Sequence, residues 1–143
     1  MYYFYHNTTA RFNAYFNADF KQTERAKEIR NNLVDRYDSI IPVFPFGTDA
    51  DAKASFQIMD DCIKKAGGVI QKHEKSKWVD ECYLVIGKGY FYKKQYFEAI
   101  DNFQYVYSKF KDQPTGALSL IWAANAYLGA NQSSSALSAL ETA

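Results

Sequence analysis

The chain has few of the residues that interrupt helices or build most metal and disulfide sites. Its 143 residues include only three prolines, two cysteines and two histidines. Two cysteines are too few for a disulfide framework. We interpret Cys62 and Cys82 as small buried residues on helices, with a bridge between them as the alternative.

Neither a charge excess nor a long apolar run is present. Seventeen Lys and Arg residues stand against sixteen Asp and Glu residues, which leaves a formal net charge of +1. That balance gives no electrostatic reason to expect nucleic acid as a partner. No apolar run approaches the roughly 20 residues that a membrane-spanning helix needs. We therefore expect no nucleic-acid partner and no direct membrane span.

Sequence patterns of common enzymes are also missing. The chain has no G-x-S-x-G, no P-loop and no G-x-G-x-x-G. Its nearest approach to a glycine-rich loop, Gly87-Lys88-Gly89, lies inside a helical pattern, where close helix packing is the better interpretation. Neither histidine has a partner at a spacing typical of zinc ligands. We expect no catalytic residues, no metal and no cofactor.

Aromatic residues are abundant, and most of the chain shows helical periodicity. Aromatic residues make up 17% of the chain, with twelve Tyr and eleven Phe, and such residues fill cores and interfaces. Only residues 39–48, with two prolines, are incompatible with a helix, and we expect an extended segment there that packs back onto the helices. Asp49 then offers a cap for the next helix. The spacing of apolar residues predicts an all-α chain of about seven helices, over 7–19, 22–37, 51–73, 77–93, 96–111, 114–129 and 133–142.

The strongest signal is an internal repeat. Tyr83, Ile86, Gly87 and Tyr90 align with Leu120, Ala123, Ala124 and Tyr127, each 37 residues later. Ala99 then aligns with Ala136, and Phe103 with Leu140, at the same offset. Repeats of this length are typical of stacked supersecondary units. A weaker third copy would place Ala14 and Ala26 in one helix pair, because they have the twelve-residue separation of Gly87 and Ala99.

These residues resemble the tetratricopeptide repeat, in which a small residue lets two helices cross and an aromatic residue follows three positions later. The resemblance implies antiparallel helix pairs in a right-handed α-solenoid, with residues 1–143 as one domain. Residues 1–76 would be degenerate N-terminal helices, 77–113 the best repeat, and 114–143 a second, truncated repeat. The implied packing residues are Tyr83, Ile86, Gly87, Tyr90, Ala99, Phe103, Ala124, Tyr127, Ala136 and Leu140.

The resemblance also implies a concave groove that binds a partner protein or peptide. The family's groove positions fall on Glu81, Leu84, Lys88, Phe91 and Tyr92 in one repeat and on Leu118, Ile121, Asn125 and Leu128 in the next. The alternative interpretation is that Leu84, Phe91, Ile121 and Leu128 are ordinary core residues. Lys88 stands where a chaperone-type carboxylate clamp would have asparagine, so a clamp of that kind is not expected.

A closer resemblance extends over most of the chain. The segments HNTTARFNAYFNADFK, IPVFPFG and KWVDECYLVIGKGYFYKKQYFEAIDNF resemble the N-terminal part of outer-membrane lipoproteins of the SprE/PorW type. Those proteins serve gliding motility and type IX secretion in Bacteroidota. The resemblance implies a fragment of a periplasmic scaffold that binds other subunits of a cell-envelope complex. The alternative is a stand-alone adaptor or co-chaperone that binds a peptide.

Overall fold

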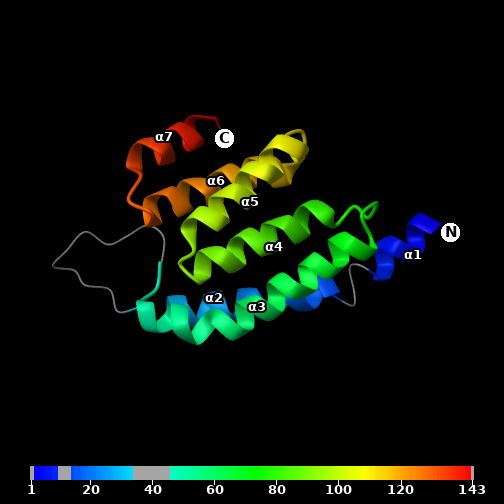
Figure 1. Cartoon of the computed structure of the whole chain (residues 1–143), viewed down its shortest axis with the longest axis horizontal. Coiled ribbons are helices and arrows are strands. Elements are labelled where there is room, and N and C mark those ends of the chain that lie inside the picture. The colour runs from blue at the N-terminus through cyan, green and yellow to red at the C-terminus, as the bar shows by residue number, and fades with distance from the viewer. Residues whose placement is uncertain (1, 10–13, 34–45, 143) are drawn as a thin grey trace.

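The computed structural model describes residues 2–9, 14–33 and 46–142, and every regular element in these ranges is a helix (Figure 1). The predicted all-α class is thereby confirmed. Most of the predicted extended segment 39–48 lies outside the described residues, and the described part, Phe46–Thr48, is neither helix nor strand. The helices are α1 (Tyr2–Thr9), α2 (Phe16–Asn31), α3 (Asp49–Lys72), α4 (Val79–Tyr92), α5 (Tyr96–Phe110), α6 (Pro114–Gly129) and α7 (Ser133–Thr142).

The last five helices lie within two residues of their predicted bounds, whereas the first two do not. The predicted break between residues 19 and 22 is wrong, because α2 runs unbroken from Phe16 to Asn31. No glycine or proline occurs in that stretch to end a helix. The proposed third repeat copy is also wrong. Ala26 lies in α2, and Ala14 lies in the helical residues 14–15 that lead directly into α2. The two alanines therefore cannot form the crossing of an antiparallel pair.

Thr48, and not Asp49, caps the start of α3. The Thr48 hydroxyl accepts a hydrogen bond from the backbone N–H of Asp51 at 3.1 Å, and the Asp51 carboxylate accepts one from the Thr48 N–H at 2.9 Å. This reciprocal pair is a capping box. Asp49 instead binds the Lys94 ammonium at 2.7 Å, which ties the start of α3 to the turn that follows α4.

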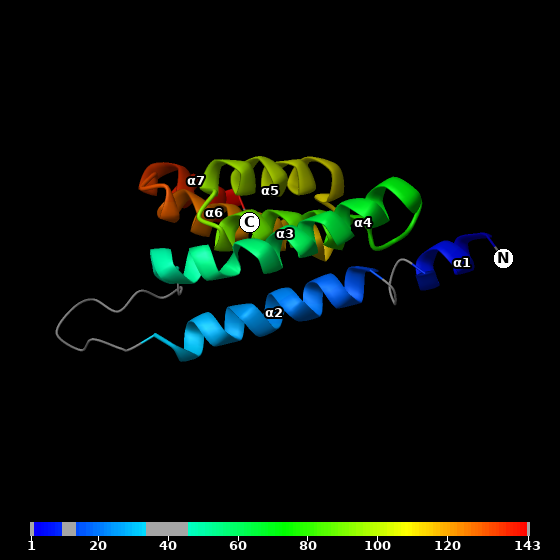
Figure 2. The ribbon, with the colours of Figure 1, turned by 60° about the horizontal axis from the view of Figure 1, so that its bottom comes forward.

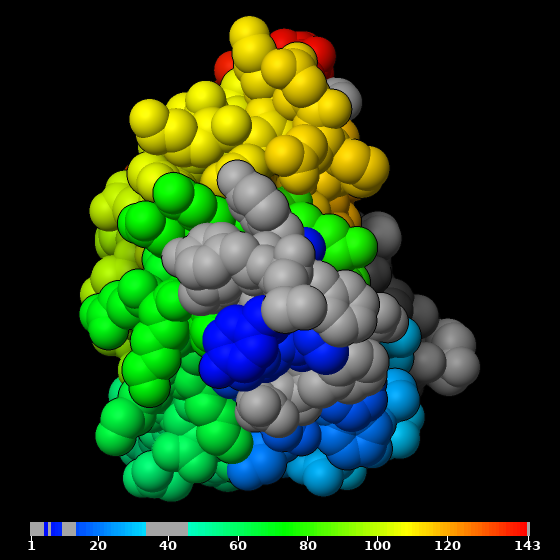
Figure 3. All heavy atoms as spheres, turned by 90° about the vertical axis from the view of Figure 1, so that its right-hand side faces the viewer, coloured from blue at the N-terminus to red at the C-terminus, as the bar shows by residue number. Residues whose placement is uncertain are grey.

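The helices pack in chain order. From α2 to α7, each helix contacts the next helix in the chain. Helices α2 and α3 also contact each other, although the connection between residues 33 and 46 separates them in sequence. Additional contacts join α2 to α4 and α4 to α6. Figure 1 shows the progression from α2 and α3 through α4 to α6 and α7, and Figure 2 shows α2 at the edge of the molecule opposite α7. The same tiers follow one another from bottom to top when the molecule is seen from the side of α1 (Figure 3).

Two hydrophobic clusters lie on opposite sides of α4. One joins α4 to α5 and α6, with Leu84, Phe91 and Phe103 at its centre. The other joins α4 to α2 and α3, and it contains Cys62 and Cys82. Both thiols are buried and unpaired, as the first interpretation of the cysteines predicts. Burial raises the pKa of each thiol, so neither is an activated nucleophile.

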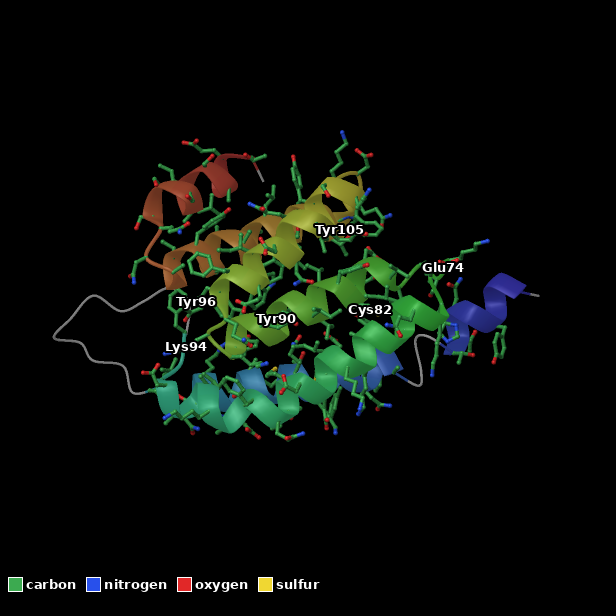
Figure 4. The ribbon with its side chains drawn as sticks, viewed as in Figure 1. Glu74, Cys82, Tyr90, Lys94, Tyr96 and Tyr105 are labelled. Atoms are coloured by element: carbon green, nitrogen blue, oxygen red, sulfur yellow. The ribbon has the colours of Figure 1, made fainter. Side chains whose placement is uncertain are left out.

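The turns of the two C-terminal helix pairs share one geometry at an offset of 37 residues. The N–H of Gln95 donates to the carbonyl of Tyr90 at 2.9 Å, and the N–H of Gln132 donates to that of Tyr127 at 2.8 Å. Lys94 and Asn131, the residues before these donors, have φ of 59° and 60°. Figure 4 labels Lys94 at the first of these turns. Because their turns share this backbone geometry, we refer to α4–α5 as the first unit and to α6–α7 as the second unit.

Candidate functional site

The predicted groove positions of α4 and α6 occupy the same helical stripe in the two units, but their surroundings differ. On α4, Leu84 and Phe91 are buried. On α6, the equivalent residues Ile121 and Leu128 are exposed, as is Leu118, while Asn125 is half-buried. Leu84 and Phe91 are therefore core residues, as the alternative interpretation holds, and they cannot present their side chains to a partner.

An aromatic cluster explains why Phe91 is buried. Its ring lies 5.5 Å from that of Trp122 on α6, 5.6 Å from Tyr96 on α5 and 5.9 Å from Phe46. Tyr92 completes the cluster with an edge contact to Phe91 at 5.5 Å. Such pairs stabilise beyond the area that they bury. The chain therefore covers this part of the predicted groove with its own residues.

Lys88 is the cation of the remaining groove surface. Its ammonium lies 5.2 Å from the centre of the Trp122 ring, which joins α4 to α6. Burial lowers the pKa of Lys88, and the Asp19 carboxylate on α2 opposes that shift. No carboxylate of the described residues lies within ion-pair distance of this ammonium. An ammonium group that is partly removed from water in this way can bind an anionic group of a ligand.

We define the groove face as the predicted groove positions of α4 and α6 that are half-buried or exposed. They are Glu81, Lys88, Tyr92, Leu118, Ile121, Asn125 and Leu128. Three of these seven positions are polar, and the other four supply apolar area. The groove face thus combines polar and apolar side chains.

Two adjacent carboxyl groups lie at the start of α4. Asp80 is buried, and its carboxylate accepts a hydrogen bond from the Thr115 hydroxyl on α6 at 2.7 Å. Oε2 of Glu81 is buried and makes no hydrogen bond to any residue that the structure describes. Burial, together with the neighbouring Asp80 carboxylate, raises the pKa of Glu81 to about 8. Glu81 therefore stays protonated to a higher pH in the folded chain than in the unfolded chain.

The raised pKa of Glu81 predicts that the chain loses stability as the pH rises. Between its ordinary pKa of 4.5 and about 8, the folded chain binds more protons at Glu81 than the unfolded chain does. The stabilising contribution is complete below 4.5 and falls as the pH increases to about 8. Glu81→Gln, which cannot ionise, should remove this part of the decline in urea unfolding measured across that range. Glu98→Gln on the exposed side of α5 is the matched control, and an undiminished decline in Glu81→Gln would contradict the assignment.

The predicted packing residues are buried or half-buried in the structure, except Leu140. Ala99, Ala124 and Ala136 are buried, and a Cβ atom at Gly87 would lie 2.5 Å from Cε1 of Phe103. Gly87 therefore makes room for the Phe103 ring, and its nearest neighbour is not Ala99. Leu140, at the position of Phe103, is exposed instead of packed. The half-buried members of the set are Tyr83, Ile86, Tyr90 and Tyr127.

The repeat alignment missed Trp122, which joins the two units. Its ring contacts those of Phe91, Tyr92 and Phe103 at 5.5 to 6.2 Å. Val85 is the residue 37 positions earlier, so no aromatic residue in the first unit marks this position. The available signal was composition, since Trp122 is one of only two tryptophans in the chain.

Neither a metal-binding cluster nor a membrane-spanning helix occurs in the described ranges. Within them, no three His, Cys, Asp or Glu side chains come together as metal ligands would. The described helices include none with the length and apolar character for crossing a bilayer. No protein-family model matches the chain, and no curated protein matches it at a significant level.

Proposed function

We propose that this chain is a non-catalytic scaffold of the tetratricopeptide type, which binds other proteins through its groove face. The single observation that carries the proposal is the repeated unit, in which α4–α5 and α6–α7 share their turn hydrogen bonds at a 37-residue offset. Units that contact mainly their neighbours generate extended binding surfaces when they stack in a right-handed solenoid. In this interpretation residues 77–113 and 114–143 are two repeats of one domain.

The composition of the groove face supports a polypeptide as its ligand. Lys88 offers a cation without a carboxylate partner among the described residues, Asn125 offers a side-chain amide, and Leu118 offers exposed apolar area. An acidic side chain beside an apolar one would satisfy these groups together. We therefore propose that the partner is a protein segment that carries this pair, without a metal or cofactor.

We further propose that the partner is a subunit of a cell-envelope complex in a type IX secretion and gliding-motility apparatus. This part rests on the resemblance of the three segments quoted above to the SprE/PorW lipoproteins. It implies a position at the periplasmic face of the outer membrane. A stand-alone adaptor that binds a peptide in the same groove face is the alternative.

Position-dependent photo-crosslinking tests both parts of the proposal. A photoreactive amino acid at Leu118 or at Asn125 should crosslink to a cell-envelope protein in a gliding bacterium that uses type IX secretion. The same amino acid at Phe97, an exposed residue of α5, should not. Crosslinks from all three positions alike would contradict a groove-face function. Crosslinks from Leu118 and Asn125 to a soluble chaperone would support the adaptor instead.

A further inference from the structure

A cavity lies beside the C-terminal half of α3, on the side of the molecule where α1 ends (Figure 1). Its volume is about 540 Å³, which is within the range typical of small-molecule pockets. Thr9 and Ala14 line one side, and α3 lines the other, with the buried residue Val69 in its wall. None of the lining residues belongs to the groove face, so this cavity is a separate feature of the molecule.

The wall that α3 contributes carries an excess of positive charge. Lys65 and Lys72 lie two turns apart on one face of the helix, and Lys64 lies beside Lys65. None of these three ammonium groups forms an ion pair with a residue that the structure describes. Asp61 is the one acidic residue in the lining. With His73 neutral, three lysines and one aspartate leave the lining with a net charge of +2.

Gly68 leaves the cavity open on the side of α3. A Cβ atom at Gly68 would meet nothing within 4 Å, and neither would one at Gly67. Of these two glycines, only Gly68 lines the cavity. Successive positions of an α-helix point about 100° apart, because a turn takes about 3.6 residues. A side chain at position 68 would therefore occupy the cavity, whereas one at position 67 would project into open space outside it.

We propose that this cavity binds the phosphate monoester group of an organic ligand. A phosphate monoester carries a charge near −2 at neutral pH, which matches the net charge of the lining. Lysine ammonium groups bind phosphate as compact point charges, whereas planar carboxylates are best matched by the arginine fork. Ala14, Val69 and the methylene stems of the lysines offer apolar surface to the organic part. The assignment does not depend on the function proposed above.

Naphthyl phosphate, which joins a phosphate monoester to an apolar ring, is the probe for this site. It should bind the full chain saturably in isothermal titration calorimetry, and naphthol, which lacks the phosphate, should bind at least about tenfold more weakly. Lys65→Gln combined with Lys72→Gln should weaken naphthyl phosphate binding to a similar degree. Lys53→Gln combined with Lys109→Gln removes the same charge from exposed positions outside the cavity and should change affinity by less than about twofold.

A pair of glycine variants tests whether the ligand enters the cavity. Gly68→Leu should abolish binding of naphthyl phosphate, and Gly67→Leu should retain it. Both variants should unfold at or above the parental temperature, because leucine favours a helix more than glycine does and neither side chain meets a neighbour. Equal binding by both glycine variants would overturn the proposal, as would equal losses in the two lysine pairs. A failure of naphthyl phosphate to bind the parent chain would also overturn it.

The same phosphate chemistry occurs in soluble compounds and in the headgroup of phosphatidic acid. Flotation of the chain with vesicles that contain phosphatidic acid distinguishes these two sources. Vesicle binding that is lost in Gly68→Leu and retained in Gly67→Leu would identify the lipid headgroup as the ligand. Binding of naphthyl phosphate without such Gly68-dependent vesicle binding would identify a soluble phosphate.

Discussion

Phe91→Ala should lower the free energy of unfolding by about 3–5 kcal/mol, the range for removal of a buried aromatic side chain. Phe91 is almost fully buried and contacts four aromatic rings, so its loss leaves a cavity that rigid neighbours cannot fill. Urea unfolding followed by circular dichroism measures the effect. The chain supplies its own control at the equivalent exposed position, where Leu128→Ala should change stability by about 0.5 kcal/mol or less.

A small effect at Phe91 would contradict the packing of α6 on α4. Equal effects at Phe91 and Leu128 would show that both positions face a core, against the exposure of Leu128. A large effect at Phe91 alone would agree with the burial of the two residues. The pair therefore tests the second unit as well as the first.

Gly87→Leu should destabilise the chain by about 1–3 kcal/mol through overpacking. Even a single Cβ atom there would lie 2.5 Å from the Phe103 ring, so the helices must separate or the ring must leave its place. Phe103→Leu should reduce this cost, and a double-mutant cycle from chemical unfolding measures the coupling between the two positions.

Gly68 offers the opposite case for comparison. A Cβ atom at Gly68, in the interior of α3, would meet nothing within 4 Å. Gly68→Ala should therefore raise stability by about 0.5–1 kcal/mol, because alanine limits the unfolded chain and suits the helix. If Gly87→Leu unfolds at the same urea concentration as the parent, the packing of Gly87 against Phe103 is wrong.

Local signals in the sequence were sufficient for the five helices after residue 48. Pro114 is the first residue of α6, as its position in the sequence predicts, since its missing N–H costs nothing there. At Gly67 and Gly68, which lie inside α3, the space beside both glycines is open. Residue type alone does not distinguish a glycine that makes room for a neighbouring side chain, such as Gly87, from a helical glycine with open space beside it.

The candidate site was less predictable than the helices, for a physical reason. Leu84 and Ile121 occupy equivalent positions, and only the presence of a covering helix makes one core and the other surface. That difference lies in tertiary contacts between units and leaves no trace in either helix's own periodicity. The burial of Lys88 beside Trp122 has the same origin, since the two residues are brought together by the packing of α4 on α6.

The order of contacts has a consequence for how a disturbance spreads through the molecule. The principal contacts of the described helices join elements no more than two places apart in the chain, so no single centre holds all of them. Opening of α7 breaks its contacts with α6 and leaves those of α2, α3 and α4 in place. Amide protection against hydrogen exchange should then decrease stepwise from α4 toward α7. A protein built this way can unfold locally at α7 while α2, α3 and α4 stay folded.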